Sequence, residues 1–313
     1  MERLEEKKKR LKKRKNELIN IKRDEILKFY YDDIKLADEF IEEIENFKSC
    51  KPQNEVDSIL KKYYRTNDKM YPLQTKMDFE ISKLIAKNFF KTIDYRLEYF
   101  FKEKIKDKQS IKFGENPHYN INGNIELTNY GDLRDLYTMV HEFSHYFDSK
   151  NGKNSTKLVL TETCAQSMER LLDNYLLNLN DDELAIYNID KSTLLEDIND
   201  RKIATFLSRY KLAEQIRPNN QKDKNYDRSY YSKYLLAQIY SHFFSQCSYN
   251  EKKEKIVELI KAIKNDDLAK ALLCFNVSLY KDNKEKRENI NQMLEDLYSL
   301  NKPNAKKIKV ILY

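Results

Sequence analysis

The stretch His141–His145 reads HEFSH, a match to the pattern HExxH. It lies within Leu133–Asp148, where apolar residues recur with helical periodicity. On a helix, positions i and i+4 lie one above the other on the same face, so both imidazoles can coordinate one zinc ion. Glu142 then lies beside the metal, where its carboxylate can take a proton from a water molecule. The stretch therefore predicts a zinc centre on a helix. The alternative is an exposed helix whose histidines bind no metal.

A catalytic zinc site needs a third protein ligand and keeps its fourth position for water. The segment TETCAQSMER, residues 161–170, places Glu162 and Glu169 two helical turns apart on one face. We predict that Glu162 is the third ligand. Glu169 would then accept a hydrogen bond from the far nitrogen of a ligand histidine and fix its tautomer. Glu169 is also the alternative ligand, and a salt-bridged pair on a solvated face is the structural alternative.

Composition favours a mainly α-helical chain. Only four of the 313 residues are glycine, and all four fall in one window: Gly114, Gly123, Gly131 and Gly152. Within that window, residues 118–128 read HYNINGNIELT, where Asn-Gly between alternating residues is the pattern of a β-hairpin. We therefore expect a small antiparallel sheet just before the HExxH helix.

Apolar periodicity predicts helices over most of the remaining chain. Residues from about Leu73 to Lys106 repeat apolar side chains at three and four positions without a breaker, which predicts one long helix. Earlier helices are expected at Ile26–Phe47 and Val56–Tyr64, and later ones run nearly to the C-terminus with one interruption near Pro218.

The positive charge is concentrated at the N-terminus. The chain carries 58 Lys and Arg against 51 Asp and Glu, a net charge of +7. Residues 1–23 hold eleven basic and four acidic side chains, so this arm alone accounts for +7 and residues 24–313 are neutral. We expect a basic helical arm, 1–23, on a single domain, 24–313. A nucleic-acid-binding surface covering the whole protein is not favoured, although the arm could contact nucleic acid or an anionic membrane.

Other features indicate the cellular compartment. The start is charged, and no stretch approaches 18 uncharged apolar residues, so we predict neither a signal peptide nor a transmembrane segment. The cysteines are far apart and form no CxxC pair: Cys50, Cys164, Cys247 and Cys274. Reduced, mostly buried thiols in a cytoplasmic protein are expected.

Together, HEFSH and TETCAQSMER resemble the zinc oligopeptidases of the thimet oligopeptidase and oligoendopeptidase F family, gluzincins that pair HExGH with a later E-x-x-S/A-x-x-x-E helix. The resemblance implies a helical, thimet oligopeptidase-like metallopeptidase fold that binds one Zn²⁺ and acts on peptides. It makes His141, His145 and Glu162 the zinc ligands and Glu142 the general base. It covers residues 118–240 by motif.

A third segment, YDRSYYSKYLLA at residues 226–237, is similar to the tyrosine-rich helix of that family. By that match Tyr234 donates to the developing oxyanion, Tyr231 contacts the substrate, and Tyr226 or Tyr230 assists. Independently of the family, a phenol aimed at the charge of the tetrahedral intermediate is the kind of donor that amide hydrolysis requires.

Zinc peptidases of this class also place a small sheet beside the active-site helix, and its edge strand can pair with an extended peptide. Asn124–Thr128 lies at the corresponding place, just ahead of the helix. We predict that this strand, with Ile125 and Leu127, aligns the substrate.

The sequence departs from the family pattern in several places. Ser144 replaces the usual glycine of HExGH, and Asp148 replaces a histidine that often follows three residues after the motif. Glu162 follows the second histidine by 17 residues, a shorter spacing than the family has. The family's histidine upstream of the tyrosine helix is absent, and His118 and His242 have no assigned role.

We therefore predict a zinc metalloendopeptidase that hydrolyses internal bonds of short peptides. Two alternatives stay open. One is a catalytically weak zinc-containing binding protein, favoured by Ser144 and the missing histidine. The other is an adaptor that uses residues 1–23 on nucleic acid or an anionic membrane, an activity that need not exclude the peptidase.

Overall fold

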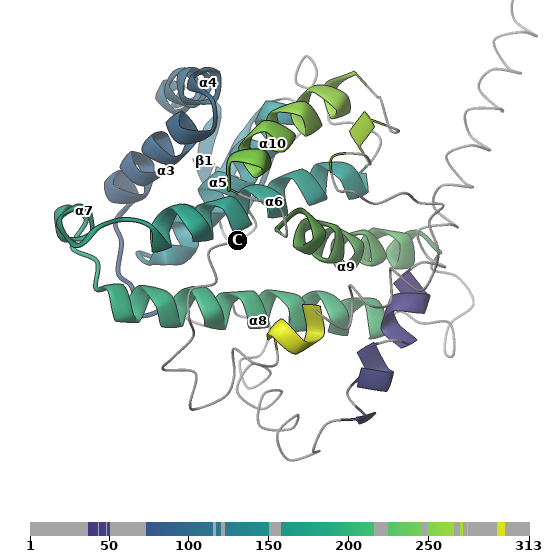
Figure 1. Ribbon diagram of the computed structural model, residues 1–313. Helices are drawn as coiled ribbons and strands as arrows, with labels where there is room; N and C mark the ends of the chain where they lie inside the picture. Colours follow the sequence, from purple (N-terminus) through teal and green to yellow (C-terminus); the bar gives the residue numbers. More distant parts are fainter. Residues whose placement is uncertain are drawn as a thin grey trace, which may run out of the picture.

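The computed structural model describes residues 37–42, 44–47, 49–50, 73–114, 117–119, 123–149, 158–215, 225–245, 249–265, 270–271, 274 and 293–297 (Figure 1). It is mainly α-helical, as predicted, with one small sheet. Its elements are α3 (Phe79–Ile93), α4 (Tyr95–Lys106), β1 (Ile111–Phe113), β2 (His118–Tyr119), β3 (Ile125–Leu127), α5 (Leu133–Asp148), α6 (Leu158–Leu177), α7 (Asp181–Ile186), α8 (Lys191–Gln215), α9 (Asn225–Ser245) and α10 (Tyr249–Lys264).

Some predictions concern residues outside these ranges. They are the basic arm 1–23, the helix Val56–Tyr64, most of Ile26–Phe47 and the interruption at Pro218. Within the part of the chain that the structure covers, no helix is both long enough and apolar enough to span a membrane.

The predicted single helix over Leu73–Lys106 is wrong, because two helices occupy this region. Asp94 ends α3 and begins α4 with an extended backbone, φ −159° and ψ 131°. Its N–H donates to the Phe90 carbonyl, and its carboxylate accepts the Arg96 N–H at 2.8 Å. Aspartate favours such caps because its short side chain competes for backbone donors. The apolar repeat continues across the break and conceals it from a periodicity argument.

The sheet is mixed rather than antiparallel. β2 and β3 form the predicted antiparallel hairpin, in which His118 pairs with Glu126. β1 then adds to the other side of β3 in parallel, with Ile111 opposite Ile125. The strand order is therefore β1-β3-β2. A parallel neighbour has no local turn signal, so the sequence pattern could not indicate it.

This order contradicts the prediction that Asn124–Thr128 is a substrate-aligning edge strand. β3 is central, and Ile125 pairs with Ile111 on one side and Tyr119 on the other. The side chains of Ile125 and Leu127 are buried in the core. Because both edges of β3 are used within the sheet, an incoming peptide has no free backbone groups there. The edge strands are instead β1 and β2.

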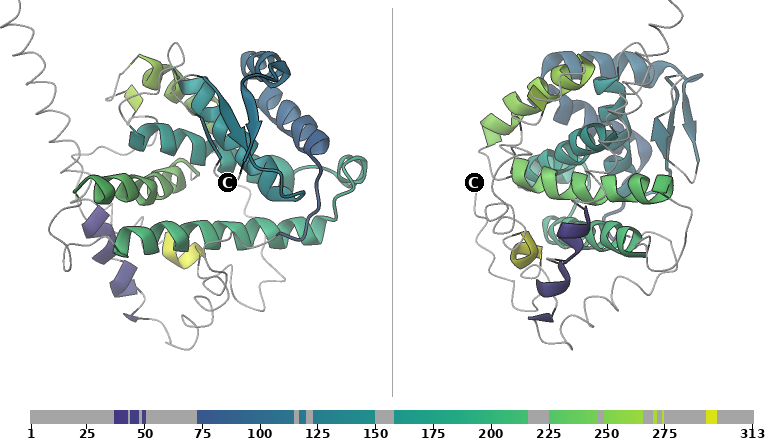
Figure 2. Two further views of the ribbon diagram at one scale, coloured as in Figure 1. Left: turned by 180° about the vertical axis from the view of Figure 1, so that it is seen from behind. Right: turned by 90° about the vertical axis from the view of Figure 1, so that its right-hand side faces the viewer.

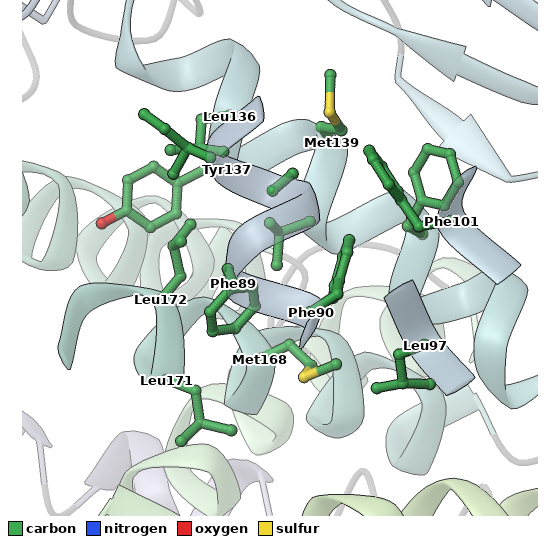
Figure 3. Close-up of a cluster of buried hydrophobic side chains, with 14 of the residues drawn as sticks. Phe89, Phe90, Leu97, Phe101, Leu136, Tyr137, Met139, Met168, Leu171 and Leu172 are labelled. Atoms are coloured by element: carbon green, nitrogen blue, oxygen red, sulfur yellow. The ribbon is translucent and has the colours of Figure 1, made fainter. Parts of the chain in front are cut away.

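The main core lies between α3, α4, α5 and α6. Phe143, in the middle of HEFSH, is fully buried, and its ring centroid lies 4.6 Å from that of Phe101 and 6.4 Å from that of Phe90. Figure 3 shows other members of this cluster from the same helices, among them Phe89, Leu97, Leu136, Met139, Met168, Leu171 and Leu172. Packing of Phe143 fixes which face of α5 is buried, and the face that carries His141 and His145 is thereby turned away from the core.

A second layer, α8 and α9, covers the other side of α6. These two helices pack on each other, and α9 packs along α6 (Figures 1 and 2). Their apolar contact includes Phe206 and Tyr210 of α8 and Leu235, Leu236 and Ile239 of α9. The two layers place α5, α6, α8 and α9 around one space, in which the candidate site lies.

Asp135 joins the sheet to the HExxH helix. Its buried carboxylate accepts the Thr128 hydroxyl at 2.8 Å and the N–H groups of Tyr130 and Gly131 at 2.9 and 2.8 Å. Gly131 has φ +75°, a left-handed conformation that favours glycine. One carboxylate therefore holds the turn between β3 and α5.

We expect Asp135→Ala to lower the free energy of unfolding by about 2 to 4 kcal/mol, because it leaves three donors without their acceptor. Urea denaturation measures the change. Glu196→Ala, at an exposed position on α8, is the control and should shift stability by less than about 0.5 kcal/mol. An Asp135→Ala midpoint equal to that of the unaltered protein would contradict this role.

Candidate active site

Three side chains converge at the centre of the molecule. α5 contributes His141 and His145, whose Nε2 atoms lie 3.2 Å apart. α6 contributes Glu162, whose Oε2 lies 3.6 Å from the Nε2 of His141 and whose Oε1 lies 3.7 Å from that of His145. The structure thus brings together the three residues that were predicted as metal ligands.

This donor set suits zinc. With Zn–N bonds of about 2.0 to 2.1 Å, two ligands of a tetrahedral site lie roughly 3.3 Å apart, which is close to the separation of the two Nε2 atoms. The one ligand atom that each of the three residues offers lies within 4.8 Å of the others. The Oε2 of Glu162 is buried and has no hydrogen-bond partner among the described residues. A buried carboxylate oxygen without a partner is unfavourable unless a cation is bound beside it.

Glu169 contacts the other nitrogen of His141. Its Oε1 lies 2.5 Å from the Nδ1 of His141, and its Oε2 accepts a hydrogen bond from the guanidinium of Arg201. Because the carboxylate faces Nδ1, it holds a proton there and leaves Nε2 facing the other two donors, as the atom that would bind a metal ion. Glu169 thus makes the predicted contact with the far nitrogen of a ligand histidine, and this position disfavours Glu169 as the alternative ligand.

The metal-free cluster perturbs the ionisation of its members. Burial alone would raise the pKa of Glu162, but the neighbouring imidazoles of His141 and His145 lower it to about 2. Burial lowers the pKa of His145 to about 4. Glu162 is therefore an anion and His145 a neutral imidazole near neutral pH, which are the forms that bind a metal ion.

Glu142 lies beside the donors. It is 5% exposed and lines the same cleft as His141, His145 and Glu162. Burial raises its pKa to about 7. The Tyr119 backbone N–H, from β2, opposes that rise. The Oε2 of Glu142 has no hydrogen-bond partner within the described part of the chain. A carboxylate with a pKa near neutrality can both accept and return a proton.

The site opens into a cleft of about 400 Å³. This volume is within the range of small-ligand pockets. β2 lines it with His118 and Tyr119, so the edge strand of the sheet borders the space beside Glu142. α8 contributes Arg201, Thr205 and Arg209, and α9 contributes Lys233, Tyr234 and Gln238.

Tyr234 is the predicted tyrosine that the structure places in the cleft. The guanidinium carbon of Arg209 lies 4.5 Å from its ring centroid, and the amine of Lys233 lies 5.0 Å from the same centroid. The backbone of α9 also carries the other three tyrosines, but their side chains are outside the described residues: Tyr226, Tyr230 and Tyr231.

The residues that depart from the family pattern lie away from the cleft wall. Ser144 is buried, and its hydroxyl donates to the Val140 carbonyl at 2.7 Å, one turn back along α5. Asp148 is also buried, and burial raises the pKa of its carboxyl group well above the usual range. His242 does not line the cleft, and its Nε2 lies 3.7 Å from the Oδ2 of Asp296.

Sequence reasoning missed the cationic residues of the site. Arg201, Thr205 and Arg209 are spaced by four, so they share one face of α8, and that spacing was the available signal. Nothing local indicated that this face meets α6. The same holds for Lys233, whose only signal in the sequence is its place within the tyrosine-rich segment.

Arg201 is a positioning residue for the metal site, because it holds Glu169 against His141 and stacks its guanidinium 3.5 Å from the centroid of the Tyr137 ring. We expect Arg201→Met to weaken zinc binding by about 10- to 100-fold, as measured by competition with a chelator at fixed pH. Lys202→Met is the matched control. Lys202 is the next residue along α8, but its amine pairs with Asp173 at 3.3 Å and it does not line the cleft of the metal ligands. Unchanged zinc affinity in Arg201→Met would contradict the role.

No protein-family model and no curated protein matches this chain. Two solved structures have a similar fold. One is a Bacillus anthracis protein described as an oligoendopeptidase F, with a TM-score of 0.58 and 12% identity over 84% of this chain. The other is PZ peptidase A with an inhibitor, with a TM-score of 0.53 and 14% identity over 82% of this chain. The aligned region spans 56% and 58% of those two chains. At such identities the likeness shows the fold.

Proposed function

We propose that this protein is a zinc-dependent endopeptidase that hydrolyses internal bonds of short peptides. The observation that carries the proposal is the convergence of His141, His145 and Glu162 in a cleft, with the buried carboxylate of Glu142 beside them. Support also comes from the fold, which resembles that of proteins described as an oligoendopeptidase and a peptidase.

His141, His145 and Glu162 would hold the ion. When bound, zinc lowers the pKa of water and polarises a carbonyl group. Glu142 takes the proton of the attacking water as general base and then returns it to the nitrogen of the leaving amine. Its pKa near 7 in the metal-free protein suits a group that must do both.

The tyrosines of α9 and one strand of the sheet are proposed to orient the substrate. Tyr234 donates a hydrogen bond to the oxygen on which negative charge develops, and Tyr231 contacts the substrate with help from Tyr226 or Tyr230. Strand β2 replaces β3 as the proposed aligning strand, since it is an edge strand and, unlike those of the other edge strand β1, its residues His118 and Tyr119 line the cleft. An extended peptide could add to β2 through main-chain hydrogen bonds.

The alternative of a zinc-containing binding protein without turnover rests on the missing histidine. The other argument for it, Ser144, loses weight because that side chain is bonded within α5 and does not line the cleft. The adaptor role of residues 1–23 is independent of the site. Steeply salt-dependent binding of RNA or anionic vesicles, lost on deletion of these residues, would support it.

The test uses the full chain. Metal analysis of the purified protein is expected to give about one zinc per chain. A library of quenched fluorescent peptides should then be cleaved, with activity lost on chelation and restored by zinc. Zinc without cleavage of any peptide selects the binding protein, and a protein that binds no zinc overturns both readings.

A further inference from the structure

Two basic side chains from different helices meet at the tyrosine wall of the cleft. Arg209 of α8 and Lys233 of α9 both line the cleft that contains the metal-ligand cluster. Both lie over the ring of Tyr234, at 4.5 and 5.0 Å from its centroid. The aromatic face attracts both cations and holds them in one place.

The other arginines of the cleft are already engaged by carboxylates. Arg134 pairs with Asp132 at 2.7 Å, and Arg201 pairs with Glu169. Arg209 differs, because no carboxylate of the described residues pairs with it. Its Nε, like that of Arg201, is buried and has no hydrogen-bond acceptor among those residues. A buried guanidinium N–H without an acceptor is unfavourable in the free protein, and a bound anion would satisfy it.

Lys233 adds a second positive charge to the same corner. The residue is 4% exposed. Burial lowers the pKa of its amine, the charge of Glu162 opposes this shift, and the charge of Arg209 adds to it, so Arg209 and Lys233 are near enough to repel each other. An anion placed between them would relieve this repulsion and interact with both.

We propose that Arg209 and Lys233 bind a carboxylate group of the peptide substrate, an inference that rests on the proposed peptidase function. A guanidinium presents a rigid fork of donors that matches the two oxygens of a carboxylate. The carboxylate is either the C-terminus of the peptide or an Asp or Glu side chain, and the chemistry of recognition is the same.

The position along α8 indicates how far this carboxylate lies from the reacting bond. Arg201 reaches the metal-ligand cluster through Glu169, and Arg209 lies two turns further along, roughly 12 Å at 1.5 Å per residue. An extended peptide covers that distance in roughly three to four residues. The carboxylate is therefore expected a few residues from the cleaved bond.

The test compares two matched pairs of quenched peptides. One pair ends in a free carboxylate or an amide, and the other carries Glu or Gln at one position. For the peptide with the recognised carboxylate, kcat/KM should exceed that of its neutral partner by roughly 10- to 100-fold. In Arg209→Gln or Lys233→Gln the ratio should fall toward one. Lys191→Gln, which removes a charge from an exposed position on the same helix, should keep the ratio.

A binding arm separates this inference from the proposed function. Zinc-free protein is titrated with the same labelled peptides, and fluorescence anisotropy gives Kd. Cleavage without preference in either pair overturns the carboxylate site and leaves the peptidase intact. Selective binding that depends on Arg209, without any cleavage, overturns the peptidase and retains the site. If the protein shows no cleavage and no selective binding, both the peptidase and the carboxylate site are overturned.

Discussion

Glu142→Gln is expected to lower kcat for peptide hydrolysis by about 10²- to 10⁴-fold, the usual contribution of a general base, while zinc stays bound. Glutamine keeps the size of the side chain but can neither take the proton from water nor return it to the leaving amine. The ligands are unchanged, so the zinc content should remain near that of the unaltered protein. The measurement is kcat on a quenched peptide together with metal analysis of the same sample.

Stability provides the check that this variant is folded. Burial raises the pKa of Glu142, which means that its site disfavours the charged form. A neutral amide should therefore leave the melting temperature unchanged or raise it. Glu196→Gln, an exposed change of the same type on α8, serves as the control for activity. Full activity in Glu142→Gln with zinc bound would overturn the mechanism.

Removal of a ligand should have the second large effect. Glu162→Ala takes away the oxygen donor of the cluster. Zinc affinity should therefore fall further than in Arg201→Met, for which the expected loss is about 10- to 100-fold. Zinc content after dialysis should drop toward zero, and hydrolysis should drop to background. Metal analysis and competition with a chelator measure the first, and the peptide assay measures the second.

Thermal melting distinguishes ligand loss from misfolding in Glu162→Ala. Zinc binds the folded state, so added zinc should raise the melting temperature of the unaltered protein. It should not raise that of Glu162→Ala, although the variant should still melt cooperatively. The control Glu196→Ala should respond to zinc as the unaltered protein does. Zinc binding of unaltered strength in Glu162→Ala would show that another residue, Glu169 being the first candidate, is the ligand.

Features that depend on neighbouring residues could be predicted from the sequence. His141 and His145 are four residues apart on one helix, so their convergence follows from helix geometry alone. The β2–β3 hairpin followed from its Asn-Gly turn. To predict Glu162 as a ligand, one must also know that α6 packs on α5. The resemblance of residues 161–170 to the second helix of the zinc oligopeptidases supplied that information.

Features that depend on distant neighbours could not be predicted in this way. The break at Asp94 was hidden because both flanking helices bury apolar faces of the same periodicity. The central position of β3 has no local signal, because the parallel pairing of β1 with β3 closes without a tight turn. Arg209 and Lys233 are 24 positions apart on two helices, and neither has a local pattern that predicts their contact with one tyrosine ring.

The helical class, the hairpin and the histidine pair with its glutamate each follow from residues a few positions apart, so the amino-acid sequence is enough to predict them. Packing between distant segments settles which face of α8 meets α6, which strand borders the cleft and which cations line it. Those contacts arise when apolar faces of separate elements are buried together. The polar residues that border these faces are then brought next to one another.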